Sequence, residues 1–109
     1  MSFELAGFTI EGPHAFYSDL KDEPGIYVIV DDQESHRRII DVGASERVRS
    51  RINFHEREVC WKANCFGTFG IGTHYVPRST VEQRFAIETA IREDCGPLPC
   101  DNPKQPPRA

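Results

Sequence analysis

Two segments rich in β-branched and aromatic residues lie in the first half of the chain, separated by a polar stretch. They are residues 25–30 (GIYVIV) and residues 38–42 (RIIDV). Runs of this composition on either side of a polar turn predict a β-hairpin. Because side chains alternate along a strand, we expect Tyr27 on one face of the first strand, and Ile39 and Asp41 together on one face of the second.

The hydrophobic spacing changes from that of a strand to that of a helix after Gly43. Ser45 suits the N-cap position, so we expect a helix over about residues 46–58. Its apolar stripe has helical spacing: Val48, Ile52 and Val59. Arg51 and His55 are four residues apart and are therefore expected to point the same way from a neighbouring polar face.

A glycine-punctuated stretch, residues 67–76, alternates again and predicts a third strand whose glycines share one face. Residues 79–82 (STVE) have the capping-box pattern at which a second helix begins, and Gly96 marks its end. Three apolar residues are expected to form its inward face: Val81, Phe85 and Ile91. The pattern predicts an α/β (α+β) fold in which a small three-stranded antiparallel sheet is flanked by helices.

The composition is that of one folded domain spanning residues 1–109. Apolar residues make up 39% and charged residues 28% of the 109 positions, which is ordinary for a globular protein. We expect residues 1–24 to be a lead-in, the core to span 24–102, and the tail 103–109 to be disordered. The longest apolar run is far shorter than the roughly 20 residues that cross a bilayer, and no export signal precedes it. We therefore expect a cytoplasmic protein with no membrane partner.

The four cysteines form two pairs with four residues between partners: Cys60 and Cys65, Cys95 and Cys100. Without an export signal they are expected to stay reduced, so disulfides are not predicted. Free thiols buried as small hydrophobic groups are the simpler interpretation. The alternative is a structural zinc site, which would make the chain a small zinc-stabilised interaction protein.

The net charge of -4 argues against a protein that binds nucleic acid through bulk positive charge. The arginines are nevertheless concentrated between positions 36 and 51: Arg37, Arg38, Arg47, Arg49 and Arg51. This cluster predicts either a local basic face or an ordinary solvated surface, and charge alone does not separate the two.

Glu88 is the most informative polar residue of the second helix, because helical spacing puts it close to the expected inward face. A desolvated carboxylate without a partner costs several kcal/mol, so this side chain needs a cation. Two interpretations remain open at this point. Glu88 binds a metal ion, or it forms a structural salt bridge with Arg51 or Arg92.

The candidate residues follow a recognisable order over residues 24–102: Gly25-Ile26-Tyr27, Asp41-Val42-Gly43, Arg51, His55, Glu88 and Asn102. This order resembles the catalytic domain of the GIY-YIG nuclease superfamily. Residues 25–27 match the first signature, and Gly43 is the glycine of the second. Arg51, eight residues beyond that glycine, stands where the family has its arginine.

The resemblance implies a metal-dependent endonuclease whose partner is DNA. Glu88 would hold one Mg²⁺ or Mn²⁺ ion, and Arg51 would clamp the phosphate. Tyr27 would position or deprotonate the attacking water, with His55 beside it to take the proton. Asn102 would orient the site. DNA recognition in the family usually needs a separate domain, so a homodimer or a separate specificity partner is expected.

Asp41 stands where the family has its second tyrosine. A carboxylate at this position either adds a metal ligand or pairs with Arg47 or Arg51 and shapes the pocket, and we favour the pairing. The departure also motivates a rival function, a catalytically impaired GIY-YIG-like module that binds nucleic acid or regulates a partner. Metal-dependent cleavage separates the two functions.

Overall fold

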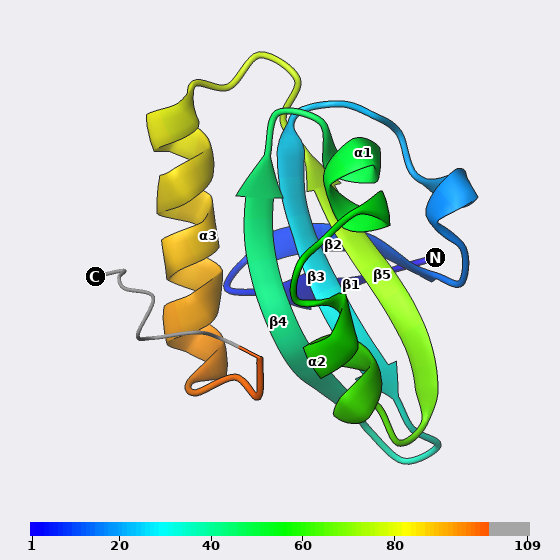
Figure 1. Cartoon of the computed structure of the whole chain (residues 1–109). Coiled ribbons are helices and arrows are strands. Elements are labelled where there is room, and N and C mark those ends of the chain that lie inside the picture. The colour runs from blue at the N-terminus through cyan, green and yellow to red at the C-terminus, as the bar shows by residue number, and fades with distance from the viewer. Residues whose placement is uncertain (101–109) are drawn as a thin grey trace.

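A five-stranded antiparallel sheet lies at the centre of the computed structural model, which describes residues 1–100 (Figure 1). In chain order its strands are β1 (Ser2–Leu5), β2 (Phe8–His14), β3 (Gly25–Asp32), β4 (Arg37–Ser45) and β5 (Thr68–Tyr75). Their order across the sheet is β1-β2-β5-β3-β4. The expected mixed α+β fold is confirmed, but the expectation of three strands is wrong, because β1 and β2 extend the sheet.

The helices of the described residues lie on both faces of this sheet (Figure 1). They are α1 (Val48–Asn53), α2 (Glu58–Ala63) and α3 (Val81–Cys95), and a short 3-10 turn, η1 (Tyr17–Asp19), precedes β3. One buried cluster contains Tyr27 of β3 with Val48 of α1 and Trp61 of α2. The other contains Val28 of β3 with Ile91 of α3. β3 therefore supplies side chains to two separate cores, as a central strand covered on both faces should.

The hairpin of β1 and β2 occupies the segment expected only as a lead-in. Phe3 pairs with Ile10 across the hairpin, and β2 then pairs with β5. The close approach depends on the glycines of β5, because a Cβ atom on Gly72 would lie 2.5 Å from Cγ2 of Ile10. The glycine-lined face predicted for the third strand, β5, thus makes room for β2, a strand that the local sequence pattern did not predict.

A turn at residues 54–57 divides the segment that was expected to form one helix over residues 46–58. The hydroxyl of Ser45 accepts a hydrogen bond from the backbone N–H of Arg47 at 3.0 Å, and α1 begins only at Val48. Ser45 is therefore not the N-cap residue that was predicted.

The same turn changes the direction of several side chains. His55 lies between the two helices, so Arg51 and His55 do not share a helical face as expected. Val48 and Ile52 are buried as predicted, whereas Val59, on α2, is 81% exposed. The predicted apolar stripe therefore ends with α1, where the helical geometry that defined it also ends.

The helix α3 is capped and terminated by the residue types that the sequence indicates, with the start shifted by one residue. Thr80 is the N-cap and forms the capping box with Gln83, and the helix ends at Gly96, which has a φ of 76°. The predicted inward face is wrong, because Val81 and Phe85 are both 64% exposed. At 3.6 residues per turn, Ile91 lies roughly 80° around the helix from Val81, and the helix packs on the Ile91 side.

The ladder between β3 and β4 contains a bulge. Ile29 pairs with Asp41 whereas Val30 pairs with Ile39, so Ile40 is an extra residue on β4. Ile40 packs with Ile29 in the core below α1 and α2, while Ile39 packs against the opposite core. The expectation that Ile39 and Asp41 share a face is therefore wrong, because one extra residue changes the alternation of the strand.

The cysteines depart from the expectation that all four are reduced. Cys60 of α2 and Cys100 form a disulfide bond, whereas Cys65 and Cys95 are free. Cys95 packs in the core below α3, on the other face of the sheet from Cys60. The four sulfur atoms do not converge, so the structure gives no support to the zinc-stabilised alternative.

Within residues 1–100, no helix is both long and apolar enough to span a membrane.

Candidate active site

Tyr27 and His55 form a buried polar pair between the sheet and the turn that joins α1 to α2. Tyr27 is 2% exposed and His55 is 4% exposed. The hydroxyl oxygen of Tyr27 lies 2.6 Å from Nε2 of His55, and the ring of Trp61 lies 4.5 Å from the imidazole. The structure thus brings together two residues that the sequence singled out, although His55 reaches Tyr27 from a turn and not from a helix.

The second ring nitrogen of His55 shows which group donates in this pair. Nδ1 of His55 accepts a hydrogen bond from the backbone N–H of Arg57 at 3.1 Å, so Nδ1 carries no proton. Burial, with the charges of Arg51 and Arg57, lowers the pKa of His55 to about 4, so the imidazole is neutral at pH 7. A neutral imidazole with a bare Nδ1 carries its proton on Nε2 and donates it to the oxygen of Tyr27.

This arrangement differs from the expectation that His55 takes a proton from Tyr27. Neither nitrogen of His55 has a free lone pair for that proton while Nδ1 is bound to the backbone. Burial raises the pKa of Tyr27, and the charges of Arg51 and Arg57 oppose that rise. In this geometry His55 therefore donates a hydrogen bond to the phenol oxygen and does not act as its base.

Gly43 leaves room for the Tyr27 ring beside the neighbouring strand β4. Gly43 pairs with Tyr27 across the β3–β4 ladder, and a Cβ atom on Gly43 would lie 2.2 Å from the hydroxyl oxygen of Tyr27. A side chain cannot occupy that space unless the ring moves away from His55. The glycine that the resemblance identified in the second signature thus has a steric role at the candidate site.

We expect Gly43→Ala to destabilise the domain by about 1–3 kcal/mol, because overpacking displaces the buried Tyr27 ring. Chemical denaturation of Gly43→Ala and of Gly43→Ala in a Tyr27→Ala background measures this effect. The added cost of Gly43→Ala should largely disappear when the ring is absent. An equal cost in both backgrounds would place the strain elsewhere.

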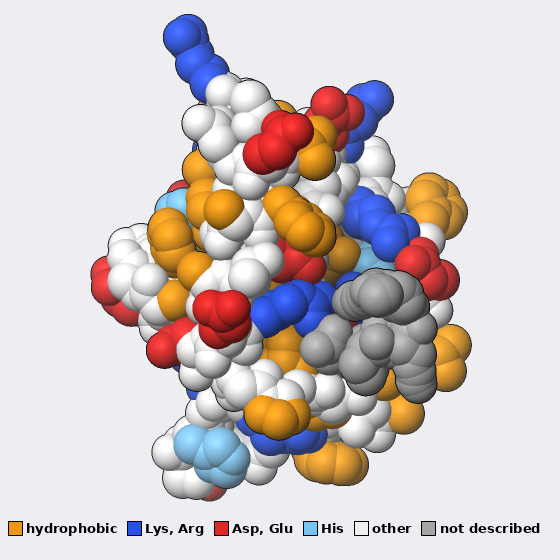
Figure 2. All heavy atoms as spheres, turned by 90° about the vertical axis from the view of Figure 1, so that its left-hand side faces the viewer, with side chains coloured by type: hydrophobic (Ala, Val, Ile, Leu, Met, Phe, Trp, Pro, Cys, Tyr) orange, Lys and Arg blue, Asp and Glu red, His pale blue; other side chains and the backbone are white. Residues whose placement is uncertain are grey.

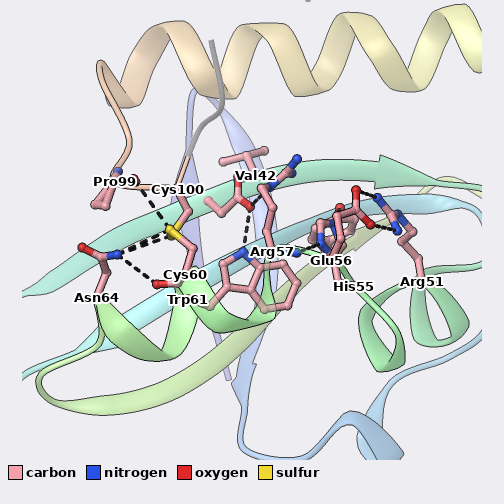
Figure 3. Close-up of polar contacts among 12 residues, drawn as sticks. Val42, Arg51, His55, Glu56, Arg57, Cys60, Trp61, Asn64, Pro99 and Cys100 are labelled. Atoms are coloured by element: carbon pink, nitrogen blue, oxygen red, sulfur yellow. Dashed lines mark hydrogen bonds and ion pairs between the residues drawn. A yellow bond between two sulfur atoms is a disulfide. The ribbon is translucent and has the colours of Figure 1, made fainter. Parts of the chain in front are cut away.

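Arg51, on α1, is held by Glu56 through a two-point ion pair (Figure 3). Its two terminal nitrogens donate to the two carboxylate oxygens of Glu56 at 2.8 and 2.9 Å. The hydrogen bonds from Arg51 lower the pKa of Glu56 to about 2. This is the geometry in which a guanidinium binds a phosphate, so a phosphate must displace Glu56 to bind Arg51 in the same way.

Glu88 reaches the same region from α3. Its side chain is 14% exposed and accepts a hydrogen bond from Nε of Arg92 at 3.0 Å. Burial raises the pKa of Glu88, and the charges of Arg92 and Arg57 oppose that rise. Of the two salt-bridge partners considered from the sequence, Arg92 is the one that the structure selects. The negative charge of Glu88 also contributes to the raised pKa of Tyr27, so the two side chains influence each other electrostatically.

Asp41 is the centre of a buried hydrogen-bond cluster that the sequence did not predict. Its Oδ2 atom accepts from Nε of Arg57 and from the indole N–H of Trp61, both at 2.7 Å. Its Oδ1 atom accepts from the backbone N–H of Val42 at 2.9 Å and lies 3.6 Å from Nη2 of Arg92. The expected pairing of Asp41 with Arg47 or Arg51 is not observed.

The residues present fit a metal site of one kind only. Among residues 1–100 no group of three or more His, Cys, Asp or Glu side chains is arranged to hold an ion. Mg²⁺ often takes just one or two protein carboxylates together with waters and substrate phosphates. The single carboxylate of Glu88 fits such a site. Asp41 does not, because both of its oxygens already accept hydrogen bonds.

Most of the arginines between positions 36 and 51 are paired with acidic residues. Acidic neighbours pair with Arg37, Arg38 and Arg47 as well as with Arg51. Figure 2 shows the α3 side of the molecule, where acidic, basic and hydrophobic side chains are interspersed. The structure therefore gives no more support than the sequence to nucleic-acid binding through bulk positive charge.

Asn102, the last predicted site residue, lies outside the described residues. Comparison of the chain with protein-family models, curated proteins and solved structures gave no match in any of the three.

Proposed function

We propose that this chain is a metal-dependent endonuclease that hydrolyses DNA phosphodiester bonds, with Tyr27, Arg51, His55 and Glu88 as its site residues. The observation that supports this most is the 2.6 Å contact between the Tyr27 hydroxyl and Nε2 of His55. A buried phenol that receives a hydrogen bond from a histidine is a suitable group to position or activate a water. The order of residues that resembles the GIY-YIG nucleases includes both members of the pair.

Each remaining requirement of phosphodiester hydrolysis has a candidate group in the neighbourhood of this pair. When bound at Glu88, a Mg²⁺ or Mn²⁺ ion supplies positive charge to the phosphoryl and leaving oxygens. Arg51 clamps a phosphate with the two nitrogens that now bind Glu56. His55 donates from Nε2 to the Tyr27 oxygen, so the hydroxyl proton of Tyr27 is free to hydrogen-bond a water or a phosphate oxygen. Burial raises the pKa of Tyr27 although the charges of Arg51 and Arg57 oppose the rise, so the phenol acts as a neutral hydrogen-bonding group.

The experiment that tests this function is incubation of the protein with supercoiled plasmid and with a panel of branched DNAs. Each substrate is treated with Mg²⁺, with Mn²⁺ and with EDTA. Nicking that requires a divalent ion supports the proposal, and the substrate cut fastest identifies the preferred DNA structure. A folded protein that cuts none of the substrates with either ion contradicts it.

A second candidate function, DNA binding without cleavage, is favoured by the pairing of the charged residues. Arg51 is occupied by Glu56 and Glu88 by Arg92, so the cluster is satisfied without substrate or metal. A binding module would show DNA affinity that is independent of divalent ions and no nicking of any substrate.

The proposed role of Arg51 as the phosphate clamp can be tested by removing the carboxylate of Glu56, which binds it. We expect Glu56→Gln to raise DNA affinity roughly three- to tenfold at low salt, because the guanidinium is freed and one negative charge is lost. Anisotropy with labelled DNA in EDTA measures this change. Glu58→Gln is the matched control, since Glu58 is about as exposed and pairs with Lys62 instead. An equal gain in both variants would leave only a general charge effect.

A further inference from the structure

We propose that Asp41 is a positioning residue for the Tyr27–His55 pair and acts through Arg57. This inference rests on the proposed function, because it assigns a role to the residue that replaces the second signature tyrosine. Arg57 links the two ends of the cluster by donating in both contacts, from its side-chain Nε to the carboxylate of Asp41 and from its backbone N–H to the ring of His55.

The β-bulge at Ile40 is the first step. With the extra residue, Asp41 pairs with Ile29, and its carboxylate meets the indole of Trp61 on the α2 side of the sheet. A bulge commonly re-aims a side chain beside a functional site. Asp41 is fully buried on this edge strand, so its charge must be compensated by its neighbours.

Arg57 provides the second step. Its Nε atom donates to Asp41 at 2.7 Å, and its side chain is only 22% exposed, so the residue is tied down at the start of α2. The hydrogen bond from Arg57 to Asp41 joins two charged groups, and such bonds are about twice as strong as those between neutral groups. The indole N–H of Trp61 donates to the same carboxylate oxygen, which holds the first turn of α2 at a second point.

The third step is the tautomer of His55. Because Arg57 is fixed, its backbone N–H points at Nδ1 of His55 and leaves the proton of the neutral ring on Nε2. That proton faces the Tyr27 oxygen at 2.6 Å. If the turn at residues 54–57 loosened, the ring could take the other tautomer, and Nε2 would then accept a hydrogen bond from the Tyr27 hydroxyl instead of donating one. Asp41 thus determines which member of the pair is the donor.

The test is side-chain ¹⁵N NMR of the histidines in the full chain, with His55→Gln to assign the signals. We expect wild-type His55 to show a protonated Nε2 and a bare Nδ1. Asp41→Asn should produce a mixture of tautomers or a faster exchange of the Nε2 proton. If the His55 signals of a folded Asp41→Asn protein match those of the wild type, the positioning role is overturned.

A second variant protects the test against misfolding, because Asp41 is buried. Arg57→Met keeps the backbone N–H and most of the side-chain volume but removes the ion pair, and we expect the same change at His55. Arg57→Lys should restore the wild-type signals, because an ammonium group can still bind Asp41. A purely structural ion pair predicts lower stability in Arg57→Met with an unchanged His55 tautomer, which contradicts the proposal.

The NMR readout needs neither DNA nor metal, so its failure is distinguishable from failure of the proposed nuclease function. If the protein also cuts DNA, Asp41→Asn and Arg57→Met should lower kcat at least about tenfold with a much smaller change in KM. If both variants alter the His55 tautomer but the wild type cuts no DNA, the positioning role is retained and the nuclease function is rejected. A normal tautomer with normal kcat in both variants would reject the positioning role alone.

Discussion

Replacing Glu88 by glutamine is expected to lower metal-dependent DNA cleavage by roughly a thousandfold while the domain remains folded. Glutamine has nearly the same shape as glutamate, so the packing of α3 is kept and the charge that would hold a divalent ion is lost. Arg92 loses its bond to Glu88 but stays 3.6 Å from Asp41, so it does not become an isolated buried charge. The measurement is the single-turnover nicking rate in Mg²⁺ and in Mn²⁺.

Glu93→Gln is the matched control for this variant. Glu93 lies on the same helix and is exposed, so the change in net charge is identical while the candidate site is untouched. We expect the control to cut at the wild-type rate. A Glu88→Gln protein that cuts as fast as Glu93→Gln would remove Glu88 from the metal site.

Tyr27→Phe carries the second large expected effect, a loss of rate of about 10²- to 10⁴-fold with little change in DNA affinity. The ring still fills its place against Gly43, so only the hydroxyl is removed. The Nε2 proton of His55 then has no acceptor, which should lower the free energy of unfolding by about 1–3 kcal/mol. Single-turnover cleavage, DNA binding in EDTA and chemical denaturation give the three quantities.

Tyr75→Phe provides the comparison, because the Tyr75 hydroxyl accepts a hydrogen bond from the backbone N–H of Lys21 at 2.8 Å and lies outside the candidate site. It should lose stability of a similar kind and retain cleavage. Equal rates for Tyr27→Phe and the wild type would show that the buried hydroxyl takes no part in the reaction.

The strands with dense β-branched residues were the predictable part of the fold. β3, β4 and β5 were located because residues 25–30, 38–42 and 67–76 carry strong local patterns. The β1–β2 hairpin was missed because its alternation is weak and its burial depends on the glycine face of β5, which is distant in sequence. Packing between strands that are far apart in the sequence is not visible in a single sequence.

The division of the expected helix has a similar cause. Residues 54–57 contain neither glycine nor proline, so local propensity favours a continuous helix. In the structure this segment forms a turn, and His55 within it contacts Tyr27 and the backbone of Arg57. Tertiary contacts therefore outweigh the propensity at the point where the candidate site is built.

The candidate site was predictable from two kinds of signal. Helical spacing drew attention to Arg51, His55 and Glu88, and the order of residues that resembles a known family added Tyr27, whereas the partners of Asp41 were not predicted. The bulge at Ile40 redirects Asp41, and a one-residue insertion of this kind leaves no mark in the alternation of so short a strand. The disulfide between Cys60 and Cys100 was also missed, because it depends on where the segment after α3 returns to α2.

The most direct measurement of the central claim is nicking of one supercoiled plasmid under single-turnover conditions, by the wild type beside Tyr27→Phe and Glu88→Gln. The site described above predicts nicking by the wild type with Mg²⁺ or Mn²⁺, none with EDTA, and almost none by either variant. Cleavage that persists in both folded variants, or a folded wild type that never nicks DNA, would contradict it.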